Sequence, residues 1–213
     1  AYEIYQCDWS SDVCSSDLVP AILRGEVSFG LGYSEPDAGS DLASLKTRAV
    51  RDGSEWVING QKIWTTGGHH ADHIFVLART SPDDVKHKGI TFLLVDMRQK
   101  GVEVRPIRMM SGESEFNEVF FTDARCPKEN VVGEVNGGWM VAMTLLGNER
   151  GAGAAINALS FREELNKLHE MVKERGLTDD PQIRQRLAKA HTKVELMRFL
   201  GYRALTAFLN GKK

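Results

Sequence analysis

Two different spacings of hydrophobic residues divide the chain into two parts. Between residues 28 and 135, apolar residues form short runs that are rich in β-branched and aromatic side chains and bounded by turn residues, which is typical of strands. Beyond residue 136 the apolar residues recur at helical intervals instead. The clearest strand signals are residues 49–51, 55–58, 73–79, 90–95 and 119–121. The pattern predicts an α+β fold, with a mainly antiparallel sheet or barrel followed by long helices.

Two dipeptides within the first part carry the signal of a tight hairpin turn. They are Asp52-Gly53 and Asn59-Gly60, and each lies between strand-like runs. A type I′ turn needs residues that tolerate positive φ, which Asn, Asp and Gly do. We therefore expect a hairpin turn at each.

The second part of the chain reads as two helices. One long helix follows Asn136-Gly137-Gly138 and runs up to Gly176, and Asp179-Asp180-Pro181 opens the next. Proline at an early helical position and carboxylates near the positive end of the helix dipole both favour this start. A helical pair cannot bury both of its faces alone, so we expect further helices or another subunit to cover it.

The composition limits the classes of function. A chain of 213 residues that is 42% hydrophobic can bury a core in one or two domains. Its net charge of −2 and scattered basic residues give no footprint for nucleic acid. The longest apolar runs are far shorter than the roughly 20 residues that span a bilayer, and no cleavable signal is recognisable. We therefore expect no membrane insertion and a cytoplasmic location.

Residues 1–18 differ from everything that follows. They contain a Ser- and Asp-rich run with Cys7 and Cys14, two of the three cysteines. We interpret this segment as non-native or as a junction, and we exclude it from the fold. A Cys7–Cys14 disulfide or a metal loop is the alternative, although no partner ligands follow at suitable spacing.

A polar loop and an aromatic strand end carry the most specific chemistry. The loop is Gly32-Tyr33-Ser34-Glu35-Pro36-Asp37-Ala38-Gly39-Ser40-Asp41, whose Gly and Pro residues let backbone N–H groups face a polar ligand. The strand end is Trp64-Thr65-Thr66. An indole offers a flat apolar face to a ring system, and a neighbouring hydroxyl can donate to a ring nitrogen. The two pieces together indicate a flavin site, whereas a β-turn with an Asx cap and a core tryptophan are the alternatives.

These motifs resemble those of the acyl-CoA dehydrogenase family, whose members carry a T/S-E-P-x-A-G-S-D loop and a W-x-T strand. The resemblance extends from about Val19 to Lys213 and includes Asn59-Gly60-Gln61-Lys62 before Trp64. It implies a central β-domain over residues 19–135, which binds flavin and acyl-CoA. Residues 136–213 would then begin a truncated carboxy-terminal four-helix bundle. On this reading the chain is a fragment that is inactive alone, and the family implies a dimer or tetramer, homomeric or heteromeric.

The resemblance also implies roles for individual residues. The FAD-binding residues would be Tyr33, Ser34, Glu35, Gly39, Ser40, Trp64, Thr65 and Thr66, with Thr66 as the candidate donor to flavin N5. Ser40, Asn148 and Arg150 would contact the substrate. Glu149 matches the catalytic glutamate of one subset of the family, while other members place this base in a region that would lie past Lys213. In the second case Glu149 only pairs with a cation or lines the site.

The implied activity is α,β-dehydrogenation of an acyl-CoA thioester, with electrons passed to an electron-transfer flavoprotein. The alternatives are a flavin oxidase or monooxygenase of the same fold, and a non-catalytic subunit of a heteromeric dehydrogenase. We expect no metal site at His69, His70 and His73, because adjacent residues on a strand point in different directions and only Asp72 adds a ligand. These histidines are instead expected in a solvated turn.

Overall fold

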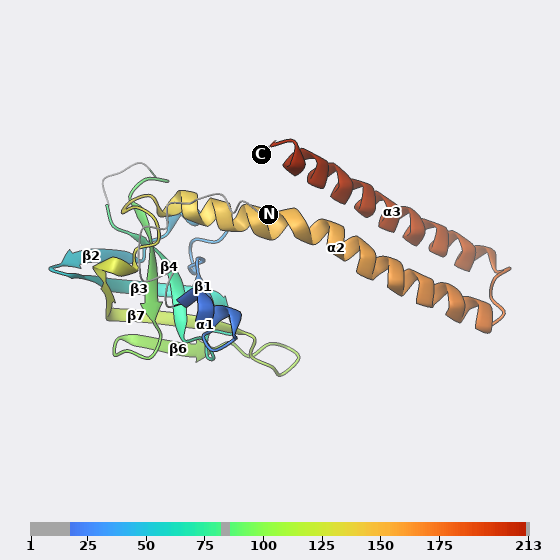
Figure 1. Ribbon diagram of the computed structural model, residues 1–213. Coiled ribbons are helices and arrows are strands. Elements are labelled where there is room, and N and C mark those ends of the chain that lie inside the picture. Colours follow the sequence, from blue (N-terminus) through green and yellow to red (C-terminus); the bar gives the residue numbers. More distant parts are fainter. Residues whose placement is uncertain (1–17, 82–85, 212–213) are drawn as a thin grey trace. The chain divides into compact units, whose positions relative to one another are not determined.

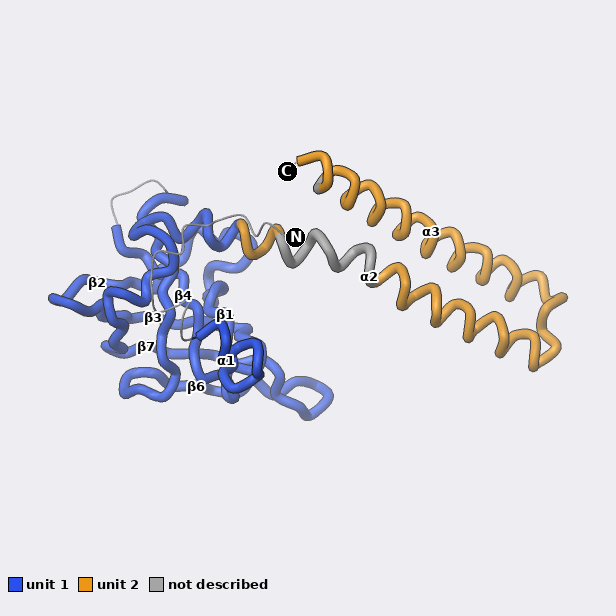
Figure 2. Tube along the Cα trace, viewed as in Figure 1, with its two compact units in different colours: residues 1–143 blue, residues 144–213 orange. Residues whose placement is uncertain are grey.

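The structure is a computed structural model that describes residues 18–81 and 86–211, with the backbone alone for residues 148–156 and 208. It divides into two compact units, residues 1–143 and 144–213 (Figure 2). The expectations for residues 1–17, including the Cys7–Cys14 alternative, lie outside the described residues. The domain boundary expected at residues 135 and 136 stays a prediction.

The first unit contains a curled, mixed sheet (Figure 1). Its seven strands are β1 (Phe29–Gly32), β2 (Arg48–Asp52), β3 (Glu55–Thr66), β4 (His73–Arg79), β5 (Ile90–Asp96), β6 (Val102–Pro106) and β7 (Phe116–Pro127). A short helix, α1 (Val19–Leu23), precedes them. A 3₁₀ helix, η2 (Leu42–Ser44), lies between β1 and β2, and a second, η3 (Lys128–Asn130), lies between β7 and the first long helix.

Most strand pairs in this sheet are antiparallel. The strands follow the order β1-β4-β2-β3-β7-β6, and β5 pairs with β4 off this path. Two pairs are parallel: β1 with β4, and β2 with β4 through Arg48 and Arg79. The predicted α+β class is therefore confirmed, and the parallel pairs are an addition that local turn signals could not reveal, because they join strands that are distant in sequence.

The core lies between the inner faces of these strands. Its centre consists of apolar side chains on β3, β4, β5 and β7 that are almost completely buried, among them Ile58, Ile74, Val76, Leu93, Val95, Val119 and Phe121. On β7 the burial alternates with a period of two residues, as one buried face of a sheet requires. This packing includes Trp56 and Ile58 of β3, the strand that carries Trp64.

One of the two predicted hairpin turns is confirmed and the other is wrong. Asp52 pairs with Glu55 across the β2–β3 hairpin, and Gly53 has a φ of 60° in its turn. Asn59-Gly60, however, lies inside β3 at a shift in the register with β7. A Cβ atom at Gly60 would lie 2.5 Å from the Thr47 hydroxyl oxygen and 2.7 Å from Thr47 Cα. Glycine is therefore required at this β-bulge, because Thr47 packs directly against it.

The second unit is a helical hairpin. Helix α2 (Gly138–Glu174) begins in the first unit and continues into the second, where α3 (Pro181–Leu209) follows it. Asp180 caps α3, since its carboxylate accepts hydrogen bonds from the backbone N–H groups of Gln182 at 2.8 Å and Ile183 at 3.1 Å. An ion pair between Arg162 and Glu195 joins the two helices. Both helices match the sequence-based prediction.

Apolar side chains remain exposed along this hairpin, including Leu159, Phe161, Leu196, Phe199 and Leu200. This agrees with the expectation that two helices cannot bury both of their faces. Among the helices in the described part of the chain, none has the length and apolar character needed to cross a membrane.

Candidate functional site

The polar loop of residues 33–41 folds back on itself and is fastened to β3. Within it, the backbone N–H and C=O groups of Glu35 and Ala38 form two hydrogen bonds, of 3.0 Å and 3.1 Å. The backbone N–H of Ile63 donates to the Ser34 carbonyl at 2.9 Å, so the loop lies directly beside the strand that leads to Trp64. The two motifs that the sequence singled out are therefore adjacent in space.

A buried ion pair fixes the inner side of this loop. The Lys62 ammonium lies 2.8 Å from Glu35 Oε1 and also donates to the Tyr33 carbonyl at 3.1 Å. The Lys62 side chain is completely buried and that of Glu35 is 6% exposed. Backbone N–H groups of Lys46, at 2.6 Å, and Thr47, at 2.9 Å, donate to the same carboxylate. Both oxygens of Glu35 are thus used inside the protein.

Burial and pairing shift the pKa values of this pair. Burial lowers the pKa of Lys62 to about 8, although the charge and hydrogen bond of Glu35 act in the opposite direction. For Glu35, burial acts to raise the pKa. The Lys62 charge and the hydrogen bonds from Lys62, Thr47 and Lys46 together outweigh burial and lower it. Glu35 therefore stays a carboxylate down to acidic pH.

Trp64 is held in an uncommon conformation with its ring exposed. Its φ is 65°, in the left-handed region, and the residue is 57% exposed. The residue lies at a register shift between β3 and β7, between Lys62 and Thr65. The Phe116 ring supports the indole edge-on, with centroids 6.1 Å apart. The alternative of a core tryptophan is thereby excluded, because more than half of the residue is exposed.

The two threonines after Trp64 have different environments. Thr65 is fully buried, and its hydroxyl donates to the Leu31 carbonyl at 3.3 Å. Thr66 is exposed beside Trp64. Only the Thr66 hydroxyl is therefore open to a ligand, while Thr65 ties β3 to β1.

The remaining loop residues are also placed differently from one another. Tyr33 is 9% exposed, and its ring packs edge-on against Phe92. Ser34 is half-buried, whereas Gly39 and Ser40 are exposed. A Cβ atom at Gly39 would meet no heavy atom within 4 Å, so this side of the loop is open to a ligand that approaches the backbone.

The structure adds Asn117, which sequence reasoning missed. Its side chain is fully buried, and its Nδ2 donates to the Thr65 carbonyl at 2.9 Å and to the Glu115 carbonyl at 3.3 Å. Asn117 shares the inner face of β7 with Val119 and Phe121. The available signal was a polar residue, Asn117, in alternation with apolar residues of the same strand face. It could not be recognised because the sequence did not indicate that the strand begins as early as Phe116.

Of the expected substrate and catalytic residues, Ser40 lies on the exposed part of the polar loop, whereas Asn148, Glu149 and Arg150 lie on α2. The backbone at Asn148, Glu149 and Arg150 is helical, and their side chains are outside the described part of the structure. They belong to the second unit, residues 144–213. Their proposed roles therefore stay predictions.

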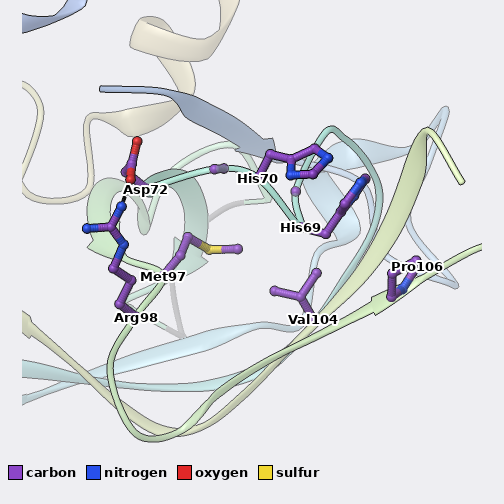
Figure 3. A pocket seen from close by; sticks show the side chains of 9 residues that line it. His69, His70, Asp72, Met97, Arg98, Val104 and Pro106 are labelled. Carbon is purple, nitrogen blue, oxygen red and sulfur yellow. Dashed lines mark hydrogen bonds and ion pairs between the residues drawn. The ribbon is translucent and has the colours of Figure 1, made fainter. Parts of the chain in front are cut away.

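An open pocket of about 530 Å³ lies just beyond the end of β3 (Figure 3). Its polar lining includes His69, His70, Asp72 and Arg98. The two imidazole rings are 3.9 Å apart, and Arg98 forms an ion pair with Asp72. His69 and His70 are exposed in a turn, as expected. The same expectation is wrong for His73, which begins β4, is half-buried and stacks on Phe29. Over the described residues, no group of three or more His, Cys, Asp or Glu side chains could hold a metal ion.

Comparison with known proteins identifies related chains. The model of the acyl-CoA dehydrogenase middle domain matches residues 30–124, and that of the acyl-CoA dehydrogenase C-terminal domain matches residues 136–213. The acyl-CoA dehydrogenase IpdE1 of Mycobacterium tuberculosis is 48% identical over 167 residues, which cover 78% of this chain and 43% of that protein. The chain thus spans about half the length of this relative.

Solved structures agree with these matches. The steroid ACAD Tcur3481-Tcur3483 superposes with a TM-score of 0.84 at 39% identity, covering 91% of this chain and 50% of that one. The ChsE4-ChsE5 complex of Mycobacterium tuberculosis gives a TM-score of 0.83 at 33% identity, covering 94% of this chain and 53% of that one.

Replacing Lys62 by methionine should strongly destabilise the first unit. The substitution leaves the Glu35 carboxylate buried without its cation, which typically costs about 3–5 kcal/mol. Urea unfolding monitored by tryptophan fluorescence measures this loss. The double variant Lys62→Met with Glu35→Gln should lose much less than the sum of the two single variants, because it leaves no unpaired buried charge.

Lys46→Met is the matched control, since Lys46 forms an exposed ion pair with Asp37 of the same loop, and it should change stability little. Equal losses for Lys62→Met and Lys46→Met would contradict a structural role for the buried pair.

The contribution of Glu35 should disappear in acid. Its pKa is lowered in the folded protein, so the unfolded state binds more protons as the pH falls below the ordinary value of 4.5. The stabilisation is present above that pH and is lost as the pH falls through the folded pKa. Unfolding free energies of the unsubstituted protein and of Glu35→Gln should therefore differ more near pH 6 than near pH 3. A difference independent of pH would contradict the ionised state of Glu35.

Proposed function

Because the chain belongs to the acyl-CoA dehydrogenase family, we propose that the protein containing it is an FAD-dependent acyl-CoA dehydrogenase. It would remove a proton from the α-carbon and a hydride from the β-carbon of an acyl-CoA thioester, which leaves an α,β double bond. The two electrons would pass to an electron-transfer flavoprotein. One observation carries the proposal: the exposed indole of Trp64 and the loop of residues 33–41 are held side by side by Lys62 and Glu35.

The residues present fit FAD chemically. Trp64 offers a flat apolar face, Thr66 an exposed hydroxyl, and Gly39 and Ser40 an open stretch of loop. Bound FAD would supply the two-electron acceptor. Glu35, Thr65 and Tyr33 would contribute to this site mainly by holding the backbone, because their side chains are buried and the first two are hydrogen-bonded inside the protein.

The chain also offers candidates for the acid–base part of the reaction. Glu149 on α2 would accept the α-proton, and Arg150 and Asn148 would bind the CoA-bearing substrate. A carboxylate enclosed by an acyl chain and a flavin has a raised pKa, which suits a base that works near neutral pH. The support for these three roles is the resemblance of their sequence to the family.

The names of similar proteins indicate which classes of acyl-CoA substrate should be tested. One similar structure is titled a steroid ACAD. A relative from Syntrophus aciditrophicus, 36% identical over 92% of this chain and 53% of its own length, is named cyclohexane-1-carbonyl-CoA dehydrogenase. We therefore propose to test ring-bearing acyl-CoAs beside straight-chain ones.

A non-catalytic subunit of a heteromeric dehydrogenase is the second candidate. Two similar structures have titles that join two proteins, Tcur3481-Tcur3483 and ChsE4-ChsE5. Purification of the protein alone, and together with a co-expressed second chain of the family, separates the candidates. Flavin and activity that appear only with the second chain, and that survive Glu149→Gln, would favour the non-catalytic subunit.

The complete reading frame that contains this chain should yield a yellow protein whose flavin absorption is bleached by acyl-CoA without oxygen. A panel of straight-chain, cyclic and steroid acyl-CoAs would identify the substrate class. Protein that binds no flavin, or flavin that no acyl-CoA reduces, would contradict the proposal.

Glu149→Gln should slow this bleaching by about 10²-fold or more while flavin binding is retained, because it removes the proton acceptor. Glu164→Gln is the control, since Glu164 is an exposed carboxylate on the same helix. An unchanged rate in Glu149→Gln would show that the base is another residue.

A further inference from the structure

Asn117 is a fully buried amide that connects three segments of the first unit. Its Nδ2 donates to the carbonyls of Thr65 and Glu115, and its Oδ1 lies 3.0 Å from His69 Nδ1. Thr65 is its direct partner in the β3–β7 pairing. The amide therefore sits immediately behind the segment that carries Trp64 and Thr66.

The orientation of this amide follows from its partners. The two backbone carbonyls can only accept hydrogen bonds, so the NH₂ group of Asn117 must face them and its oxygen must face His69. His69 Nδ1 is then the donor in the remaining bond. In the neutral imidazole the hydrogen consequently lies on Nδ1, and Nε2 is an acceptor.

The segment in front of Asn117 needs such support. A tryptophan at a φ of 65° is strained, and conformations of this kind persist only when surrounding contacts determine them. The Glu115 carbonyl, which Asn117 binds, also accepts the Gly67 backbone N–H at 2.8 Å. Asn117 thus holds the chain on both sides of Thr66.

We propose that Asn117 is a positioning residue for the flavin-facing Trp64–Thr66 segment, an inference that rests on the proposed FAD site. Asn117 does not need to touch the flavin. It fixes the Thr65 carbonyl and thereby the direction of the Trp64 ring and the Thr66 hydroxyl. Without the amide, the folded protein keeps its core but presents these two groups in several arrangements, and it binds FAD more weakly.

The FAD dissociation constant of Asn117→Ala tests the proposal in the full-length protein. We expect an increase of about tenfold or more, which is the effect of losing roughly one buried hydrogen bond. Asn59→Ala is the matched control, because Asn59 also bridges β3 and β7, through two hydrogen bonds with Asp123, but near the far end of β3. The FAD dissociation constant of Asn59→Ala should stay within about twofold of the unsubstituted value, well below the tenfold increase expected for Asn117→Ala.

Ile58→Ala separates positioning from stability. Ile58 is a fully buried core residue of β3, so its truncation destabilises the fold without touching the site. A merely structural role of Asn117 predicts that Ile58→Ala, at equal loss of unfolding free energy, weakens FAD binding as much as Asn117→Ala does. That result, or an unchanged dissociation constant in Asn117→Ala, would overturn the proposal. If the unsubstituted protein binds no FAD, the proposed function itself fails.

The protonation of His69 provides a readout that does not require FAD. Long-range ¹H–¹⁵N NMR spectra of the unsubstituted protein at a pH where His69 is neutral should show the hydrogen on Nδ1, and Asn117→Ala should lose this fixed tautomer. A hydrogen found on Nε2 in the unsubstituted protein would contradict the orientation of the amide and the proposal with it.

Discussion

The buried ion pair between Lys62 and Glu35 is the interaction on which the candidate site depends. Lys62 belongs to β3, the strand that carries Trp64, and Glu35 belongs to the polar loop, so a single contact of 2.8 Å joins the two motifs. Removing two charges from water is costly, and the cost is offset only when the geometry is good and the remaining hydrogen bonds are made. Here the Tyr33 carbonyl and the backbone N–H groups of Lys46 and Thr47 provide them. The pair thereby joins the loop to β3.

The open surface of the site follows from this internal arrangement. Because Glu35, Thr65 and the Tyr33 ring are directed inward, the groups left for a ligand are the indole of Trp64, the hydroxyl of Thr66 and the outer loop at Gly39 and Ser40. The strained backbone at Trp64 has its own support behind it in Phe116 and Asn117. The exposed side chains of Trp64 and Thr66 thus lie on β3, whereas Phe116 and Asn117, which support them, lie on β7.

Much of the fold could be predicted from the sequence because its signals are local. Strand-like runs, the turn at Asp52-Gly53 and the proline at the start of α3 each depend on neighbouring residues only. The turn predicted at Asn59-Gly60 was wrong, because a β-bulge that packs closely against Thr47 requires the same residue types as a turn. The parallel pairing of β1 with β4 depends on contacts between distant segments, which a local pattern does not contain.

For the site, the sequence located the two motifs but could not assign directions to their side chains. The resemblance implies a cofactor-binding role for Glu35, which stays a prediction, and the structure adds that its carboxylate pairs with Lys62. Asn117 could not be predicted as a site residue, because its role depends on burial and on three hydrogen bonds. Two of these are to backbone carbonyls, and the third is to His69, which is distant in sequence. Spacing alone cannot reveal such partners.

Amide hydrogen exchange of the full-length protein with and without FAD tests most directly whether the loop and the end of β3 form one cofactor site. The structure predicts that FAD slows exchange in residues 33–41 and 64–68 together, and leaves the hairpin turn at Gly53 unchanged. Protection by FAD that is confined to other segments, such as the pocket around His70 and Arg98, would contradict this assignment of the site.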